Sequence, residues 1–328
     1  MDSDLEIARA AKPMKIEEVA NQLGLASSDL ILHGPHIAKV SWDALSSGIT
    51  NKKGKLILVT SVNPTPYGEG KTVTTIGLNQ GLNHRGHNAC CVIREPSLGP
   101  VFGIKGGAAG GGLSQVLPME QINLHFTGDL HAITSAHNLC SAILDNHLHR
   151  GNDLDLDTNR IFWPRVIDMN DRTLREVSIG LGGPSTGVTR SERFDITAAS
   201  EVMAILSLSK SYEDLRSRLG RIIVAESKSG LPVTAEQLGA SGSMALLLRE
   251  AMLPNLVQTL EGNPAFVHCG PFANIAHGNS SIIADDLALS RADYVVTEAG
   301  FGAEMGAEKA LHIKALASGV APSCIVLN

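Results

Sequence analysis

The residues best suited to chemistry form the stretch Thr-Pro-Tyr-Gly-Glu-Gly-Lys-Thr, residues 65–72, which we call the phosphate loop. Its two glycines let the backbone approach a phosphate closely, while Lys71 can reach the β- and γ-phosphates and the Thr72 hydroxyl can bind Mg²⁺. The strict P-loop pattern has a glycine where Thr65 stands. An apolar run before the loop and a helical pattern after it favour a nucleotide site over an ordinary turn with an exposed lysine.

A second candidate group follows the next predicted strand. Arg94, Glu95 and Pro96 come directly after the apolar run of residues 88–93, and ligands bind at the carboxyl ends of strands in open α/β sheets. We therefore expect Arg94 to lie beside the phosphate loop, where its planar fork can hold a transferring phosphoryl group or an acyl phosphate. The alternative is a surface arginine paired with Glu95.

The glycine-rich run of residues 103–112 contains Lys105 and has too little side chain to fill a core. It is either a backbone cradle for a ligand or a flexible hinge, and the cradle is favoured because so many glycines allow a close approach. Scattered histidines show no spacing typical of a metal site.

Two later segments also follow predicted strands, where functional loops belong. One of them holds Asn274 and His277, and the other holds Phe301 between two glycines. An aromatic ring in that position predicts a stacking surface for a flat ligand, with core filling as the alternative.

Composition excludes several classes of protein. The net charge of −6, from 33 acidic and 27 basic residues, offers no basic field for a nucleic acid. The five cysteines lack C-x-x-C spacing and are typical of reduced, buried thiols in a cytosolic protein. An acidic amino terminus without an apolar signal region, and no apolar run of membrane-spanning length, predict a cytoplasmic protein without a membrane partner.

The elements that must position these residues alternate along the chain. Strands are predicted at residues 55–60, 88–93, 221–225, 265–268, 294–297 and 323–327. Helices are predicted at residues 6–24, 72–82, 127–149, 196–208, 241–253, 280–291 and 303–317. This alternation predicts a doubly wound, mostly parallel α/β sheet of the P-loop NTPase type, with a loop-rich excursion at about residues 152–195. Residues 1–328 are thus expected to form one nucleotide-binding α/β domain.

Several motifs together resemble the formate–tetrahydrofolate ligase family, and the similarity runs from about residue 5 to residue 328. The phosphate loop, the Arg-Glu-Pro-Ser-Leu-Gly-Pro segment from Arg94 and the glycine-rich run carry the resemblance. So do the segments Asn-Leu-His-Phe-Thr-Gly-Asp from Asn123 and Gly-Pro-Phe-Ala-Asn-Ile-Ala-His-Gly from Gly270. The family's phosphate loop has Thr-Pro-x-Gly-Glu-Gly-Lys-Thr in place of the strict pattern.

The resemblance implies a two-step, ATP-dependent ligation of formate to tetrahydrofolate through formyl phosphate, with Mg²⁺ and a stimulating monovalent cation, K⁺ or NH₄⁺. The residues that it implies for ATP are Thr65, Pro66, Tyr67, Gly68, Glu69, Gly70, Lys71 and Thr72, the last also toward Mg²⁺. The catalytic residues that it implies are Lys71, Arg94, Glu95 and Asp129. On the folate side it implies Lys105, Thr127, Asn274, His277 and Phe301. Enzymes of this family are typically homotetramers.

The resemblance leaves alternatives open. Family members are typically longer than this chain, so we expect the carboxyl-terminal folate and adenine side to be absent, or supplied by a complementing segment. Leu113 and Ala310 stand where the family has aromatic residues, so ligand contacts on that side can differ. The competing hypotheses are an inactive phosphate- or nucleotide-binding remnant of the family and a P-loop ATPase with another acceptor.

Overall fold

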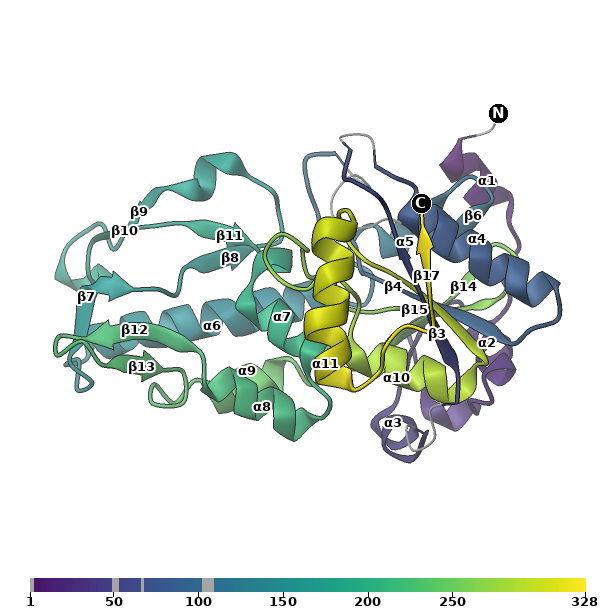
Figure 1. Cartoon of the computed structure of the whole chain (residues 1–328). Coiled ribbons are helices and arrows are strands. Elements are labelled where there is room, and N and C mark those ends of the chain that lie inside the picture. Colours follow the sequence, from purple (N-terminus) through teal and green to yellow (C-terminus); the bar gives the residue numbers. More distant parts are fainter. Residues whose placement is uncertain (1–2, 49–52, 66–67, 102–108) are drawn as a thin grey trace. The chain divides into compact units, whose positions relative to one another are not determined.

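The computed structural model describes residues 3–48, 53–65, 68–101 and 109–328. The chain divides into two compact units (Figure 1). The first, which we call the sheet unit, comprises Met1–Thr127 and Leu253–Asn328, and the second comprises Gly128–Met252. Pro66, Tyr67 and Lys105, three predicted site residues, lie outside the described residues.

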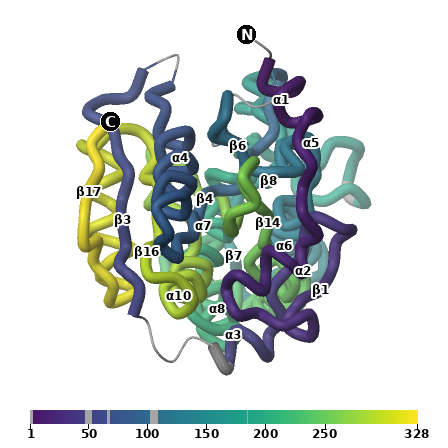
Figure 2. Tube along the Cα trace, turned by 90° about the vertical axis from the view of Figure 1, so that its right-hand side faces the viewer, coloured from purple at the N-terminus to yellow at the C-terminus, as the bar shows by residue number. Residues whose placement is uncertain are grey.

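Five parallel strands form the centre of the sheet unit. They are β15 (Pro264–Val267), β4 (Ala89–Ile93), β16 (Tyr294–Glu298), β3 (Lys55–Thr60) and β17 (Cys324–Leu327), in that spatial order. Figure 2 shows β17, β3, β16 and β4 side by side. The near-continuous apolar runs of β3, β4, β15 and β16 fit burial on both faces, and β4 and β15 are buried throughout, whereas β17 at the edge is largely exposed. The expected mixed α/β fold with a largely parallel central sheet is confirmed.

One edge of the sheet is antiparallel. There β14 (Asn255–Thr259) pairs with β15, β2 (Ala38–Val40) and β6 (Ser114–Leu117), while β1 (Leu30–Leu32) pairs with β2 and β5 (Gly110–Gly111) with β6. Sequence analysis missed β14. Only a tight turn containing Gly262, with φ +77°, joins β14 to β15, and so short a connection allows only an antiparallel pair.

Two helices beside the parallel strands shape the candidate site. Helix α4 (Lys71–His84) packs on β3, β4 and β16, and α10 (Ile282–Arg291) packs on β4, β15 and β16. Ser281 caps α10 by accepting a hydrogen bond from the Ala284 N–H.

The prediction of a single helix at residues 6–24 is wrong. It is two helices, α1 (Asp4–Ala10) and α2 (Ile16–Gln22), with extended backbone at Ala11. Pro13 explains the break, because proline lacks an N–H donor and disfavours helical backbone in the residue before it. Further helices of this unit are η1 (Ser27–Asp29), α3 (Trp42–Gly48) and α5 (Met119–Ile122).

The helix expected near residues 303–317 is present with altered winding. Its first turns are π-helical, at η5 (Ala303–Ala307) and η6 (Ala310–Lys314), before α11 (Ala315–Ser318). Gly319 ends the segment in the left-handed conformation, with φ +77°.

The second unit contains four main helices, α6 (Asp129–His149), α7 (Glu201–Leu208), α8 (Tyr212–Gly220) and α9 (Ser241–Leu247). Its short strands are β7 (Leu156–Ile161), β8 (Arg165–Ile167), β9 (Val177–Ile179), β10 (Arg190–Glu192), β11 (Phe194–Ile196), β12 (Ile223–Ser227) and β13 (Pro232–Thr234). Single turns occur at η2 (Arg172–Arg175), η3 (Pro184–Thr186) and η4 (Thr197–Ala199). The strand predicted at residues 221–225 is β12, which pairs with β7 and β13 and stays outside the central sheet.

None of the described helices combines the length and the apolar character needed to span a lipid bilayer. Among the described residues, no cluster of three or more histidine, cysteine, aspartate or glutamate side chains is arranged to hold a metal ion.

The fully buried Phe266 on β15 tests the importance of the central sheet. We expect Phe266→Ala to lower the free energy of unfolding by about 3–5 kcal/mol, because it removes buried apolar area and leaves a cavity. Urea denaturation followed by circular dichroism measures the loss. Leu316→Ala, at a side chain that is 77% exposed, is the control and should change stability by less than about 0.5 kcal/mol.

Candidate functional site

The phosphate loop joins the carboxyl end of β3 to the start of α4, as the sequence predicted. Gly68 and Gly70 have positive φ of 82° and 72°, a backbone conformation that favours glycine. Gly70 directly precedes α4 and Lys71 is the first residue of the helix. Because the first N–H groups of a helix lack partners within it, this helix start can accept an anion.

The Lys71 ammonium is buried and already has an anionic partner. It forms an ion pair with the Glu69 carboxylate and donates a hydrogen bond to Ser61 Oγ at 3.3 Å. Glu69 also accepts a hydrogen bond from the Thr65 N–H. Burial pushes the pKa of Glu69 upward, but the Lys71 ammonium and the Thr65 N–H outweigh it, so the pKa lies below its usual range. The Glu69 carboxylate thus occupies two donors of the phosphate loop, the Lys71 ammonium and the Thr65 N–H.

Strand order corrects the predicted surroundings of Arg94. The sequence suggested that the end of β4 lies directly beside the phosphate loop, but β16 lies between β3 and β4. The last residue of β16, Glu298, bridges the gap. Its carboxylate accepts a hydrogen bond from Thr72 Oγ1 at 2.6 Å and faces Arg94 Nε at 3.4 Å.

Arg94 is buried, at 8% exposure, so the alternative of a surface arginine paired with Glu95 is wrong. Its ion-pair partner is Glu298, and its Nη1 donates a hydrogen bond to the Pro271 carbonyl at 3.4 Å. Gly300 makes room for it, because a Cβ on Gly300 would lie 2.9 Å from Arg94 Nη1. Glu95 is also buried, and its N–H donates to the Cys269 carbonyl at 2.7 Å.

Of the folate-side candidates, Phe301 and His277 have unusual surroundings. Phe301 is 39% exposed and has φ +57°, a strained conformation of the kind that often marks a functional loop. His277 is buried, and neither ring nitrogen has a well-aligned hydrogen bond among the described residues. Burial first, and then the positive charge of Lys314, lower the pKa of His277 to about 3.

The remaining predicted residues lie in other loops and at the start of α6. Asn274 is exposed in the loop after β15, and Thr127 Oγ1 donates a hydrogen bond to Asn255 Oδ1 at 2.8 Å. Asp129 is the first residue of α6 and belongs to the second unit. Sequence analysis did not include Glu298 among the site residues. The same signal could have indicated it, because Glu298 is the last residue of an apolar strand and Arg94 directly follows another.

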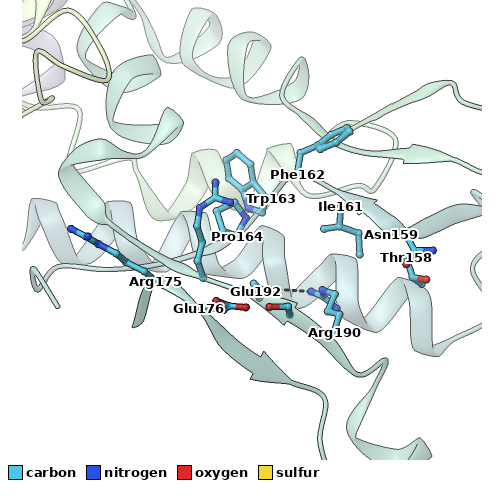
Figure 3. A pocket seen from close by; sticks show the side chains of 12 residues that line it. Thr158, Asn159, Ile161, Phe162, Trp163, Pro164, Arg175, Glu176, Arg190 and Glu192 are labelled. Carbon is cyan, nitrogen blue, oxygen red and sulfur yellow. Dashed lines mark hydrogen bonds and ion pairs between the residues drawn. The ribbon is translucent and has the colours of Figure 1, made fainter. Parts of the chain in front are cut away.

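A cavity of about 450 Å³ in the second unit contains none of the predicted residues (Figure 3). Phe162, Trp163, Arg175, Arg190 and Glu192 are among the residues that line it. Of its five charged lining residues, Arg190, Glu192 and Arg193 form ion pairs. Arg190 forms ion pairs with Glu192 at 2.7 Å and Asp145 at 2.5 Å, and Arg165 contacts the same two carboxylates. The phosphate loop therefore remains the stronger candidate site.

The Glu69–Lys71 ion pair predicts competition with phosphate. We expect Glu69→Gln to bind inorganic tripolyphosphate roughly fivefold more tightly at low salt. The substitution removes a competing carboxylate whose ion pair with Lys71 contributes about 1 kcal/mol at a partly exposed site. Isothermal titration calorimetry measures the affinity. Weaker binding by the variant would show that Glu69 assists the phosphate.

Burial of His277 predicts a dependence of stability on pH. Because its folded-state pKa of about 3 lies below the ordinary value of 6.5, the unfolded state takes up the proton first and stability falls as pH drops from 6.5 toward 3. Between pH 6 and pH 4 the wild type should lose about 1.4 kcal/mol per pH unit more than His277→Gln. Urea titrations at several pH values measure both slopes, and equal slopes would contradict the assignment.

Comparison with known proteins agrees with these features. The family model described as formate–tetrahydrofolate ligase matches residues 2–328. Formate–tetrahydrofolate ligase from Ruegeria sp. (strain TM1040) is 58% identical over 325 residues, which cover 99% of this chain and 58% of that protein. The ligase from Mesorhizobium japonicum is 59% identical over 325 residues, with the same coverage. The ligase from Roseiflexus sp. (strain RS-1) is 57% identical over 327 residues, or 100% of this chain and 58% of that protein.

The chain thus spans about 58% of the length of the curated relatives that it matches. The match covers every segment from which the candidate site is built, including the phosphate loop and the loops after β4, β15 and β16. The chain belongs to the formate–tetrahydrofolate ligase family.

Proposed function

We propose that this protein ligates formate to tetrahydrofolate at the expense of ATP, giving 10-formyltetrahydrofolate, ADP and phosphate. One observation carries the proposal. A phosphate loop with a buried lysine and a buried arginine lie at the carboxyl ends of strands in one parallel sheet, and Glu298 joins Thr72 to Arg94. This arrangement suits phosphoryl transfer followed by use of an acyl phosphate.

In this proposal the sheet unit works as a doubly wound fold of the P-loop NTPase type, and residues 1–328 constitute the nucleotide-binding portion of the ligase. Residues Thr65 to Thr72 hold the phosphates of ATP through main-chain amides and the Lys71 ammonium, which exchanges Glu69 for phosphate oxygens. The Thr72 hydroxyl has the chemistry to hold Mg²⁺. Bound Mg²⁺ would neutralise charge on the phosphates.

The first step makes formate reactive. A formate oxygen forms a bond to the γ-phosphorus, the bond to the bridging oxygen breaks, and ADP leaves with that electron pair. Lys71 stabilises charge on the transferring group, and Arg94 holds the resulting formyl phosphate with its guanidinium. Formate alone is a poor acyl donor, because acyl transfer from it would have to expel hydroxide or oxide, and both are poor leaving groups.

In the second step, N10 of tetrahydrofolate forms a bond to the formyl carbon, loses its proton, and phosphate departs as the carbon–oxygen bond breaks. We assign Glu95 and Asp129 to the region of the acyl phosphate, with a monovalent cation, K⁺ or NH₄⁺, and Thr127 to the folate side next to them. Lys105, Asn274, His277 and Phe301 are assigned to the folate side. The partly exposed ring of Phe301 supports stacking on a flat ligand. A cytoplasmic homotetramer is the proposed working state.

The assay is release of ADP that depends on both formate and tetrahydrofolate. We expect Lys71→Ala to lower kcat/KM at least a hundredfold, since loss of a charge on the transferring phosphoryl costs on the order of 3 kcal/mol or more. Lys210→Ala, at an exposed lysine outside the sheet unit, is the matched control and should retain activity.

The two competing hypotheses predict different results in the same assay. Formate-independent ADP release would favour a P-loop ATPase with another acceptor. Nucleotide binding without turnover under any condition would favour the inactive remnant.

A further inference from the structure

We infer that Glu298 is a positioning residue that couples the metal–nucleotide site to the acyl-phosphate site, by holding the Thr72 hydroxyl for Mg²⁺ and the Arg94 guanidinium for the phosphoryl group. The inference rests on the proposed function and adds a residue to it. Three features carry it: the position of Glu298 in the sheet, its two contacts and its burial.

The position of Glu298 follows from the pairing of β16. In the register of the sheet, Glu298 lies opposite Val59 on β3, and Thr297 lies opposite Val92 on β4. The carboxyl end of β16 is therefore between the strand that leads into the phosphate loop and the strand that leads into Arg94. Glu298 is the acidic residue at that end of the strand.

The two carboxylate oxygens of Glu298 contact different functional groups. Oε2 accepts a hydrogen bond from Thr72 Oγ1 at 2.6 Å, and Oε1 faces Arg94 Nε at 3.4 Å. One side chain thus connects the second residue of α4 to the loop after β4. Moving either partner would disturb the other through this carboxylate.

The backbone around Glu298 is held in place. Its carbonyl accepts a hydrogen bond from Asn279 Nδ2 at 2.9 Å, and the N–H of the next residue, Ala299, donates to the Val59 carbonyl at 2.9 Å. The residue is 1% exposed, so water cannot replace its carboxylate as the partner of the buried Arg94. Side chains held in this way by packing and hydrogen bonds fix the geometry of a site.

Glu298 also has the chemistry that a metal–nucleotide site requires at this position. In nucleotide-binding phosphate loops, the loop serine or threonine binds Mg²⁺ together with an acidic residue at the end of a neighbouring strand. Glu298 lies at the corresponding strand end, and its carboxylate accepts the hydrogen bond that orients the Thr72 hydroxyl. In addition, the contact with Arg94 lets the same carboxylate orient the Arg94 guanidinium, which is proposed to hold formyl phosphate.

The test compares nucleotide affinity with and without Mg²⁺ in the 328-residue chain. Calorimetric titration with ADP should show tighter binding in the presence of Mg²⁺ for the wild type. Glu298→Gln should reduce that enhancement at least about tenfold, as loss of an outer-shell carboxylate does at metal sites. Glu308→Gln, at an exposed carboxylate of the same unit, is the matched control and should retain the full enhancement.

A coupling measurement separates positioning from a merely structural role. Thr72→Val should lose the Mg²⁺ enhancement too, and the double variant should lose no more than either single variant, because all three break the same contact. Electron paramagnetic resonance of Mn²⁺ with ADP gives an independent readout, with a weaker bound-Mn²⁺ signal expected in Glu298→Gln. Thermal melting establishes that each variant is folded.

The outcomes are distinguishable. A folded Glu298→Gln with the wild-type Mg²⁺ enhancement would overturn the inference while leaving the proposed function intact. Additive losses in the double variant would do the same. If Glu298→Gln does not fold, Glu298→Asp and Thr72→Val decide, and full Mg²⁺ enhancement in both would overturn the inference. A wild type that binds no ADP would overturn the proposed function together with the inference.

Discussion

The geometry of the candidate site depends on one buried carboxylate. This carboxylate contacts both a hydroxyl at the start of α4 and a buried arginine. Glu298 contacts Thr72 and Arg94, and a guanidinium in a dry interior requires such a partner, because an unpaired buried charge is very costly. The relative positions of β3, β16 and β4 are therefore tied to the chemistry of the site. A change in the sheet that separates these strands would leave Arg94 without its carboxylate.

Glycine residues allow the loops at the carboxyl end of the sheet to approach one another closely enough for Glu298 to contact Arg94. A Cβ on Gly270 would lie 2.2 Å from the Glu95 carbonyl oxygen, and one on Gly306 would lie 1.7 Å from the Gly300 carbonyl oxygen. Backbone thus packs directly on backbone after β15, β16 and within η5. The high glycine content of the chain serves close packing around Arg94 as well as the phosphate loop itself.

The Glu69 carboxylate contacts donors that are proposed to bind phosphate. The Glu69 carboxylate pairs with Lys71 and accepts from the Thr65 N–H, so a phosphate that uses these donors must displace it. In the proposed function, binding exchanges one anion for another, and displacing the Glu69 carboxylate offsets part of the affinity for phosphate. Phe301, with its strained backbone, lies in the loop directly after β16.

The amino-acid sequence by itself determined the unit of β3, phosphate loop and α4, because residues adjacent in the chain carry the apolar run, the glycines and the helical pattern. It also indicated most helices and the parallel character of the sheet, and Pro13 could have revealed the break between α1 and α2. Strand order was decided only by tertiary structure: β16 lies between β3 and β4, and β14 adds an antiparallel edge. Thr72 and Glu298 are 226 residues apart, so their contact depends on which strands pair, and local sequence preferences do not specify that choice.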